Sequence, residues 1–157
     1  MLIRPATAAD AGAIVDLIQC LADFEKLEGP SAGAKARLLR DALDPACPLI
    51  LWVAELDGEV RAYAAWFYTY STFLARKTLY LEDLFVHPEV RRRGVGKAMM
   101  EALRAEAEAG DCGRFEWSVL GWNEDAQRFY ETLGATAESD WQMMRITLPS
   151  AGADPVS

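Results

Sequence analysis

Apolar and polar positions follow two different periods along the chain, and the changes of period predict the order of its elements. A spacing of three to four residues between apolar positions is typical of amphipathic helices, and four segments have it: residues 8–25, 34–43, 94–109 and a short stretch after Asn123. Short, nearly continuous apolar runs predict strands: residues 2–4, 48–56, 60–70, 78–86, 115–120 and 141–148. The Asp57-Gly58 pair between two of these runs is a hairpin signal.

This order predicts an α/β fold built on one mixed sheet. The segment 78–120 reads strand, helix, strand and has the length of a crossover that joins two parallel strands. We therefore expect one domain over residues 1–148. The remaining residues, 149–157, are small and polar, so we expect a disordered tail there.

The amino-acid composition excludes several classes of molecule as expected binding partners. The 157 residues include 24 acidic and 16 basic side chains, a net charge of −8, which disfavours binding to nucleic acid. No apolar run approaches the roughly 18 residues that cross a bilayer, so we expect a cytoplasmic protein without a membrane partner. Three scattered cysteines and a single histidine predict neither a disulfide framework nor a metal site.

The charge is unevenly distributed. Residues 1–60 carry a net charge of −5, residues 61–110 carry +2, and residues 111–157 carry −5. The basic middle is due to one cluster: Arg91, Arg92, Arg93 and Lys97. A solvated helix start would explain this cluster, and so would a binding site for a polyanion.

The cluster lies where a strand gives way to a helix, in the sequence HPEVRRRGVGKAMM after Val86. Gly94 and Gly96 let backbone approach a ligand closely, and the free N–H groups and dipole of the helix start attract an anion. A Walker loop is excluded because position 91 is not glycine and position 98 is not serine or threonine. A dinucleotide fingerprint would need glycine in place of Met99.

The spacing Arg91-x-x-Gly94-x-Gly96 resembles the coenzyme A pyrophosphate loop of the general N-acetyltransferase (GNAT) superfamily. WNEDAQRFYETLGA, at 122–135, is similar to that superfamily's second hallmark, an asparagine-capped helix with a Phe-Tyr pair and a terminal glycine. IRPATAADAGAI and YLEDLFV add a resemblance to the diamine (spermidine/spermine-type) branch, over roughly residues 2–148.

The resemblance implies a mostly antiparallel GNAT-like sheet with helices on both faces, acetyl-CoA as co-substrate without a metal, and transfer to a small cationic amine. Dimers are usual in this branch, so it also implies a homodimer. By match, Tyr130 protonates the departing thiolate and Asn123 contacts pantetheine, although Tyr130 also suits a core position. The implied coenzyme contacts are Leu84, Phe85, Val86, Arg91, Arg92, Arg93, Gly94, Val95, Gly96, Lys97, Asn123, Ala126 and Tyr130.

Transfer to an amine needs a proton acceptor, because an aliphatic ammonium has a pKa of about 10.4 and only the neutral amine attacks. Glu82 and Asp83 are neighbours on a strand, so their side chains should point to opposite faces. The resemblance makes Glu82 the base, directly or through water, although a salt bridge at the strand edge would also explain it. It places the N–H donors for the carbonyl oxygen at Leu84–Val86, near a bulge.

The implied acceptor site comprises Phe24, Glu25, Tyr70, Glu82 and Asp83. The branch has aspartate after the tyrosine that matches Tyr70, whereas this chain has Ser71, which favours a short diamine or lysine-like amino acid. Two alternatives stay open: a protein or peptide N-acetyltransferase, and a non-catalytic acyl-CoA-binding regulator.

Overall fold

The computed structural model describes residues 1–149, which fall into two compact units. The first unit is Met1–Ser118 and contains the whole sheet, and the second begins at Val119. Each unit is described by itself below. The expectation of a single domain over residues 1–148 stays a prediction.

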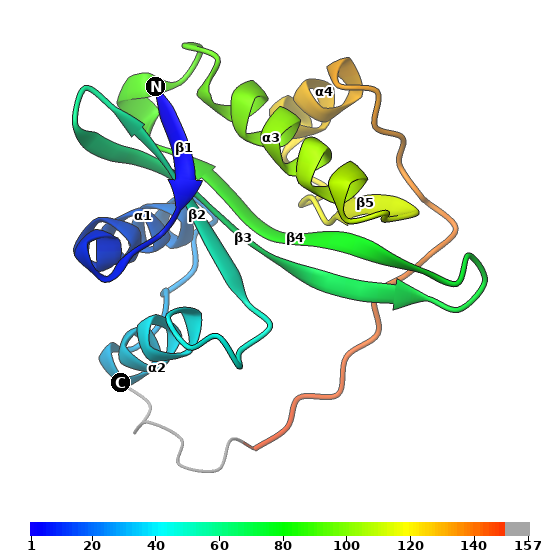
Figure 1. Cartoon of the computed structure of the whole chain (residues 1–157), viewed down its shortest axis with the longest axis horizontal. Coiled ribbons are helices and arrows are strands. Elements are labelled where there is room, and N and C mark those ends of the chain that lie inside the picture. The colour runs from blue at the N-terminus through cyan, green and yellow to red at the C-terminus, as the bar shows by residue number, and fades with distance from the viewer. Residues whose placement is uncertain (150–157) are drawn as a thin grey trace. The chain divides into compact units, whose positions relative to one another are not determined.

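The first unit is a five-stranded sheet in the order β1-β2-β3-β4-β5 (Figure 1). Its strands are β1 (Leu2–Pro5), β2 (Ile50–Leu56), β3 (Glu59–Ser71), β4 (Arg76–Val86) and β5 (Arg114–Trp117). The first three pairings are antiparallel, and β4 pairs with β5 in parallel. The prediction of a mixed, mostly antiparallel sheet is confirmed, including the parallel crossover.

The helices begin close to where the sequence predicts them. They are η1 (Ala8–Asp10), α1 (Ala11–Phe24), α2 (Ala32–Ala42), η2 (Pro88–Val90), α3 (Val95–Ala109) and α4 (Glu124–Thr132). Ser31 caps α2 by accepting a hydrogen bond from the backbone of Ala34, and Asn123 caps α4 in the same way from Ala126. None of the helices within residues 1–149 is both long and apolar enough to cross a bilayer.

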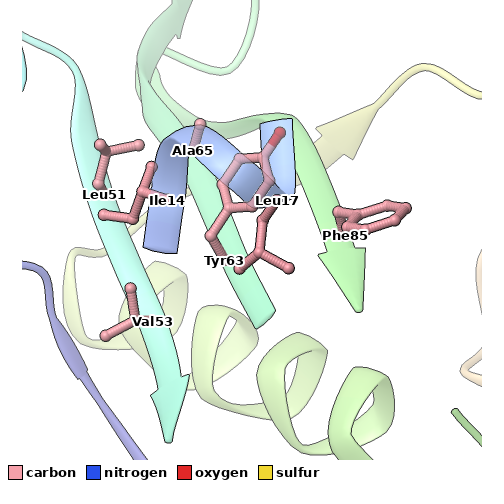
Figure 2. Packing of buried hydrophobic residues seen from close by; sticks show 7 residues of the cluster. All are labelled: Ile14, Leu17, Leu51, Val53, Tyr63, Ala65 and Phe85. Carbon is pink, nitrogen blue, oxygen red and sulfur yellow. The ribbon is translucent and has the colours of Figure 1, made fainter. Parts of the chain in front are cut away.

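Two helices cover opposite faces of the sheet in the first unit. Ile14 and Leu17 of α1 pack with Tyr63 and Ala65 of β3 in a cluster completed by Leu51, Val53 and Phe85 (Figure 2). Tyr68 is an odd number of positions from Tyr63, so it lies on the other face, where its hydroxyl donates to Glu106 of α3 over 3.4 Å. The predicted arrangement of helices on both faces is confirmed.

The entry into α1 is held by one buried ion pair. Arg4 binds Asp10 through two hydrogen bonds of 2.8 and 2.9 Å, and Asp10, only 5% exposed, also accepts from the Thr7 backbone N–H at 2.7 Å. Hydrogen bonds from the Arg4 guanidinium hold the pKa of the Asp10 carboxyl well below its usual range. The charged form of Asp10 therefore stabilises the folded state.

The predicted strand over 141–148 is wrong, because this segment belongs to neither a strand nor a helix. A strand needs a neighbour to complete its backbone hydrogen bonds, and apolar composition alone cannot supply one. Its large apolar side chains are exposed, from 69% for Met143 to 87% for Ile146. The run predicted at 115–120 is a strand only to Trp117. Of the predicted disordered tail, residues 150–157 lie outside the described residues.

Replacing Asp10 tests the anchor at the start of α1. We expect Asp10→Asn to lower the free energy of unfolding by about 1–3 kcal/mol at pH 7, because it removes a charged hydrogen-bond partner. Since the folded-state pKa is depressed, the difference should shrink as the pH falls below about 4, where Asp10 in the unfolded wild type becomes neutral. Urea unfolding at pH 7 and pH 3 measures it. Asp41→Asn, which alters an exposed pair with Arg40, is the control.

Candidate active site

Strand β4 has two neighbours over only part of its length. Strand β5 pairs with Thr78–Leu81 and stops, while β3 continues beside β4 to Val86 (Figure 1). Within residues 1–149, the stretch Glu82–Val86 therefore has no strand partner on the β5 side of the sheet. An unpaired edge of this kind exposes backbone donors and acceptors to a ligand.

The hydrogen-bond pattern shows which N–H groups face this open edge. The His87 N–H donates to the carbonyl of Arg61, on β3, over 2.8 Å. In an antiparallel ladder the direction alternates, so the Phe85 N–H points toward β3 and the N–H groups of Leu84 and Val86 point away from it. Two backbone donors thus lie two positions apart on the open edge.

A β-bulge interrupts β4 at Glu82. Leu81 is opposite Trp66 and Asp83 is opposite Ala65, so Glu82 is the extra residue between two adjacent pairs. This corrects one expectation, because regular alternation does not hold across Glu82 and Asp83. The pattern of apolar and polar residues could not locate the bulge, because a bulge leaves no mark in that pattern.

The bulge is followed by a half-buried acid on the face that α1 covers. Asp83, which is half-buried, accepts a hydrogen bond from the hydroxyl of fully buried Tyr63 over 3.3 Å. Burial raises the pKa of Asp83 to about 6, and the negative charges of Glu82 and Glu25 act in the same direction. Glu25 is the C-cap of α1, so α1 and β4 together bring the carboxylates of Glu25 and Glu82 into electrostatic reach of Asp83.

The loop after β4 has the backbone form of an anion site. Gly94 has φ +80° and Arg92 has φ +62°, so both occupy the left-handed region, which is strained for arginine. The first backbone bond of α3 runs from the Ala98 N–H to the Gly94 carbonyl, at 3.0 Å. The N–H groups of residues 95–97 precede it and carry the partial positive charge of the helix start.

The four cations of this loop have different surroundings. Arg93 lies 3.9 Å from Asp57 and Lys97 lies 3.6 Å from Glu101. Arg91 donates from Nε to the Val86 carbonyl over 3.1 Å, with its guanidinium over two aromatic rings. Within residues 1–149, Arg92 makes no hydrogen bond or ion pair, which leaves its charge available for an anion.

The second unit contains the predicted acid and its helix. Asn123 Oδ1 accepts from the Ala126 N–H over 3.2 Å, so this amide oxygen serves as the helix cap. Tyr130 is half-buried with its ring against Phe129, the ring centroids being 5.3 Å apart. Burial raises the pKa of the Tyr130 hydroxyl, which keeps it protonated at neutral pH.

The predicted acceptor residues of the first unit do not all come together. Phe24 is at the end of α1 and immediately precedes Glu25. Tyr70, which is 63% exposed, is five positions along β3 from the partner of Asp83, or about 16 Å at strand rise. Tyr63 was not predicted as a site residue, and only the register of β3 against β4 brings it to Asp83. Among the residues described, no group of three or more His, Cys, Asp or Glu side chains could hold a metal ion.

The sequence that forms this site matches a known protein family. Residues 16–135 match the model of the Acetyltransferase (GNAT) family. The chain belongs to this family. A solved structure from Clostridium difficile 630, described as a possible acetyltransferase, has the same fold, with a TM-score of 0.83 at 19% identity, covering 95% of this chain and 98% of that one.

Curated relatives support the diamine-type branch. The chain is 33% identical to thialysine N-epsilon-acetyltransferase of Sus scrofa over 157 residues, which cover 93% of this chain and 92% of that enzyme. It is 37% identical to L-ornithine N5-acetyltransferase of Arabidopsis thaliana over 91 residues, which cover 58% of this chain and 40% of that enzyme. The chain is an N-acetyltransferase of the GNAT family.

The raised pKa of Asp83 predicts a gain in stability when its charge is removed. Because ionising Asp83 is harder in the folded than in the unfolded state, wild-type stability falls as the pH rises from about 4 to 6. Asp83→Asn should therefore be about 1–2 kcal/mol more stable than wild type at pH 8 and equal to it at pH 4. Denaturant unfolding at both pH values checks this, with exposed Asp16→Asn as the control. A gain of the same size at both pH values would contradict it.

Proposed function

We propose that this chain transfers acetyl from acetyl-CoA to a primary amine of a small diamine, polyamine or lysine-like amino acid. The observation that carries the proposal is the layout of β4. Its unpaired end bears the Leu84 and Val86 N–H groups beside the acids Glu82 and Asp83, and the loop into α3 follows directly. In this proposal, one strand end holds the donors for an acyl oxygen between an acidic cluster and an anion site.

The residues of the loop fit the phosphates of a coenzyme. In this proposal, the N–H groups of residues 95–97 and the Arg92 side chain bind these phosphates. Space beside Gly94 is open, because a Cβ added there would meet nothing within 4 Å. Acetyl-CoA supplies a thioester whose acetyl carbon accepts the amine and whose thiolate departs.

Backbone N–H groups of β4 stabilise the acyl oxygen in this proposal. As the amine nitrogen attacks the carbonyl carbon, negative charge develops on the oxygen. The Leu84 and Val86 N–H groups are held by the ladder with β3 and need no rearrangement to reach it. Donors of this kind contribute typically about 3–4 kcal/mol of transition-state stabilisation.

Two further groups move protons in the proposed mechanism. Glu82, which is exposed at the bulge, takes the amine proton directly or through a water molecule. Tyr130 gives its proton to the thiolate as the C–N bond forms and the C–S bond breaks. Its assignment rests on the family resemblance and on the raised pKa of its hydroxyl.

The remaining acids hold the far end of the acceptor. A carboxylate stabilises the protonated form of a nearby amine, so the groups that bind the distal ammonium must differ from the group that deprotonates the reacting one. In this proposal, Glu25 and Asp83 bind the distal ammonium of the acceptor. Tyr70 lies about 16 Å along β3 from Ala65, the residue opposite Asp83. The acids and Tyr70 therefore do not form one long acceptor site, and a site limited to the acids favours a short acceptor. The names of the Sus scrofa and Arabidopsis thaliana relatives give thialysine and L-ornithine as substrates, and both names also favour a short acceptor.

An amine panel tests the proposed function. Purified protein is incubated with acetyl-CoA and diamines, spermidine, thialysine, ornithine, lysine or lysine-containing peptides, and free thiol release is followed. We expect turnover with a short diamine or lysine-like amino acid and a lower kcat/KM with spermidine. Turnover with peptides alone would indicate a protein N-acetyltransferase, and coenzyme binding without turnover would indicate a regulator.

Removing the phenolic proton tests Tyr130. We expect Tyr130→Phe to lower kcat by about 10²-fold or more while acetyl-CoA affinity stays nearly constant, because the ring remains and only the acid is lost. Steady-state kinetics and calorimetric titration with acetyl-CoA measure the two quantities. An unchanged kcat would remove Tyr130 from the mechanism.

Reversing the charge of Arg92 tests the proposed phosphate-binding site in the loop before α3. We expect Arg92→Glu to raise the Kd of acetyl-CoA at least about tenfold at low salt, and less at high salt because screening weakens the interaction. Arg40→Glu, on the exposed face of α2, is the control and should leave this Kd unchanged. Equal affinity of Arg92→Glu and wild type would exclude Arg92 from phosphate binding.

A further inference from the structure

The hydroxyl of Tyr63 is buried inside the first unit beside a single acid. Tyr63 is 0% exposed and belongs to the hydrophobic cluster that α1 makes with the sheet (Figure 2). Within residues 1–149, its hydroxyl makes one hydrogen bond, which it donates to Oδ2 of Asp83 over 3.3 Å. A buried hydroxyl costs free energy unless it is hydrogen-bonded. The fold is therefore most stable when the Asp83 carboxylate stays where Tyr63 reaches it.

The register of β3 against β4 sets this contact. Tyr63 is opposite Phe85, and Ala65 is opposite Asp83, so the phenol and the carboxylate are diagonal neighbours on one face of the sheet. Diagonal neighbours are about 7–8 Å apart, which is within reach of an aromatic side chain. Ala65 has only a methyl group opposite Asp83, which leaves room for the tyrosine side chain to extend to the carboxylate.

The hydrogen bond from Tyr63 occupies one of the two carboxylate oxygens of Asp83. Oδ2 accepts it, and within residues 1–149 Oδ1 accepts no hydrogen bond. Asp83 is half-buried and directly precedes Leu84, the first residue with an N–H group on the open edge of β4. A side chain that is already ordered binds a ligand at a lower cost in conformational entropy than a mobile one. Oδ1 is thus an acceptor held in place at the open end of the strand.

We propose that Tyr63 is a positioning residue for the acceptor amine: its hydroxyl fixes the Asp83 carboxylate so that Oδ1 receives the distal ammonium. This inference rests on the proposed function, in which Asp83 binds that ammonium, and deepens it. Because Tyr63 is fully buried, it acts through Asp83 and not on the acceptor itself. The Tyr63–Asp83 pair is then the part of the site that distinguishes an acceptor with two amino groups from a monoamine.

Tyr68 provides a matched control on the other face of β3. Its hydroxyl also donates to a carboxylate, that of Glu106 on α3, over 3.4 Å. Replacing either tyrosine by phenylalanine keeps the ring and removes one hydrogen bond from a hydroxyl to a carboxylate. Only the carboxylate beside Tyr63 belongs to the open end of β4. An effect confined to Tyr63→Phe therefore reports on the acceptor site and not on the general loss of a hydrogen bond.

Pairs of acceptors that differ in the distal amino group measure the positioning. Putrescine is compared with butylamine, and lysine with ε-aminocaproic acid. In Tyr63→Phe we expect the KM for the acceptor with two amino groups to rise about tenfold at constant kcat, and that for the monoamine to change less than about twofold, because a hydrogen bond to the charged group that binds the distal ammonium is lost. The Kd of acetyl-CoA should stay at its wild-type value, and Tyr68→Phe should resemble wild type throughout.

A double-mutant cycle tests whether Tyr63 acts through Asp83. Asp83→Asn by itself should weaken the preference for the acceptor with two amino groups. Adding Tyr63→Phe to it should then change this preference little, because both substitutions affect one interaction. Additive effects of the two substitutions would overturn the proposal. So would an equal loss of kcat/KM with both members of an acceptor pair, which would make the role of Tyr63 merely structural.

Titration of the Asp83 carboxyl by NMR gives a readout that needs neither ligand nor turnover. Burial opposes the charged form of Asp83, and so do the charges of Glu82 and Glu25. The hydrogen bond from Tyr63 favours the charged form. The pKa of Asp83 should therefore exceed its wild-type value of about 6 in Tyr63→Phe and keep that value in Tyr68→Phe.

The titration also separates failure of the inference from failure of the proposed function. An Asp83 pKa that is the same in Tyr63→Phe and wild type would show that the hydroxyl does not hold the carboxylate, and would overturn the positioning role. If wild type turned over no amine, the proposed function would fail, while the titration would still decide whether Tyr63 holds Asp83.

Discussion

Strand β4 has two neighbours over Thr78–Leu81 and only one over the rest of its length, and the candidate site depends on this constraint. Where β5 ends, a bulge at Glu82 begins, and the two backbone N–H groups beyond it have no strand to pair with. The next residues along the chain form the turn into α3, whose first N–H groups lie within the same short stretch of sequence. Incomplete pairing of one strand thus brings two acids, two backbone N–H groups without a strand partner among the described residues, and the basic loop before α3 into one short segment.

Two aspartates of the first unit show that the neighbours of a buried or half-buried acid decide the direction in which its pKa shifts. Asp10 is buried with Arg4, whose hydrogen bonds lower its pKa, so its charge stabilises the fold. Asp83 is half-buried beside Glu82 and Glu25, and within residues 1–149 the Tyr63 hydroxyl is its one hydrogen-bond donor, so its pKa is raised to about 6. A fold that retains an acid in such a place loses stability there, as is common at sites that bind or transfer a cation.

The basic cluster of the loop illustrates why net charge is an incomplete guide to a binding site. In the sequence, four cations at positions 91–97 look equivalent. In the structure, Arg93 and Lys97 lie near carboxylates and Arg91 is held between two rings, whereas Arg92 remains available. The acids show the same effect, because Asp83 lies within electrostatic reach of Glu82, its neighbour in the sequence, and of Glu25, which is far along the chain.

Local patterns in the sequence were sufficient for the order of the helices and strands from β1 to α4, the parallel crossover, the glycine-opened helix at Gly94 and the capped helix after Asn123. Each depends on residues a few positions apart, so their spacing records it directly. The bulge at Glu82, the pairing of Tyr63 with Asp83, the stacking of Arg91 on Phe24 and the lack of a strand at 141–148 were decided by tertiary structure. Each of these depends on strand register or on a partner far along the chain, which no local period specifies.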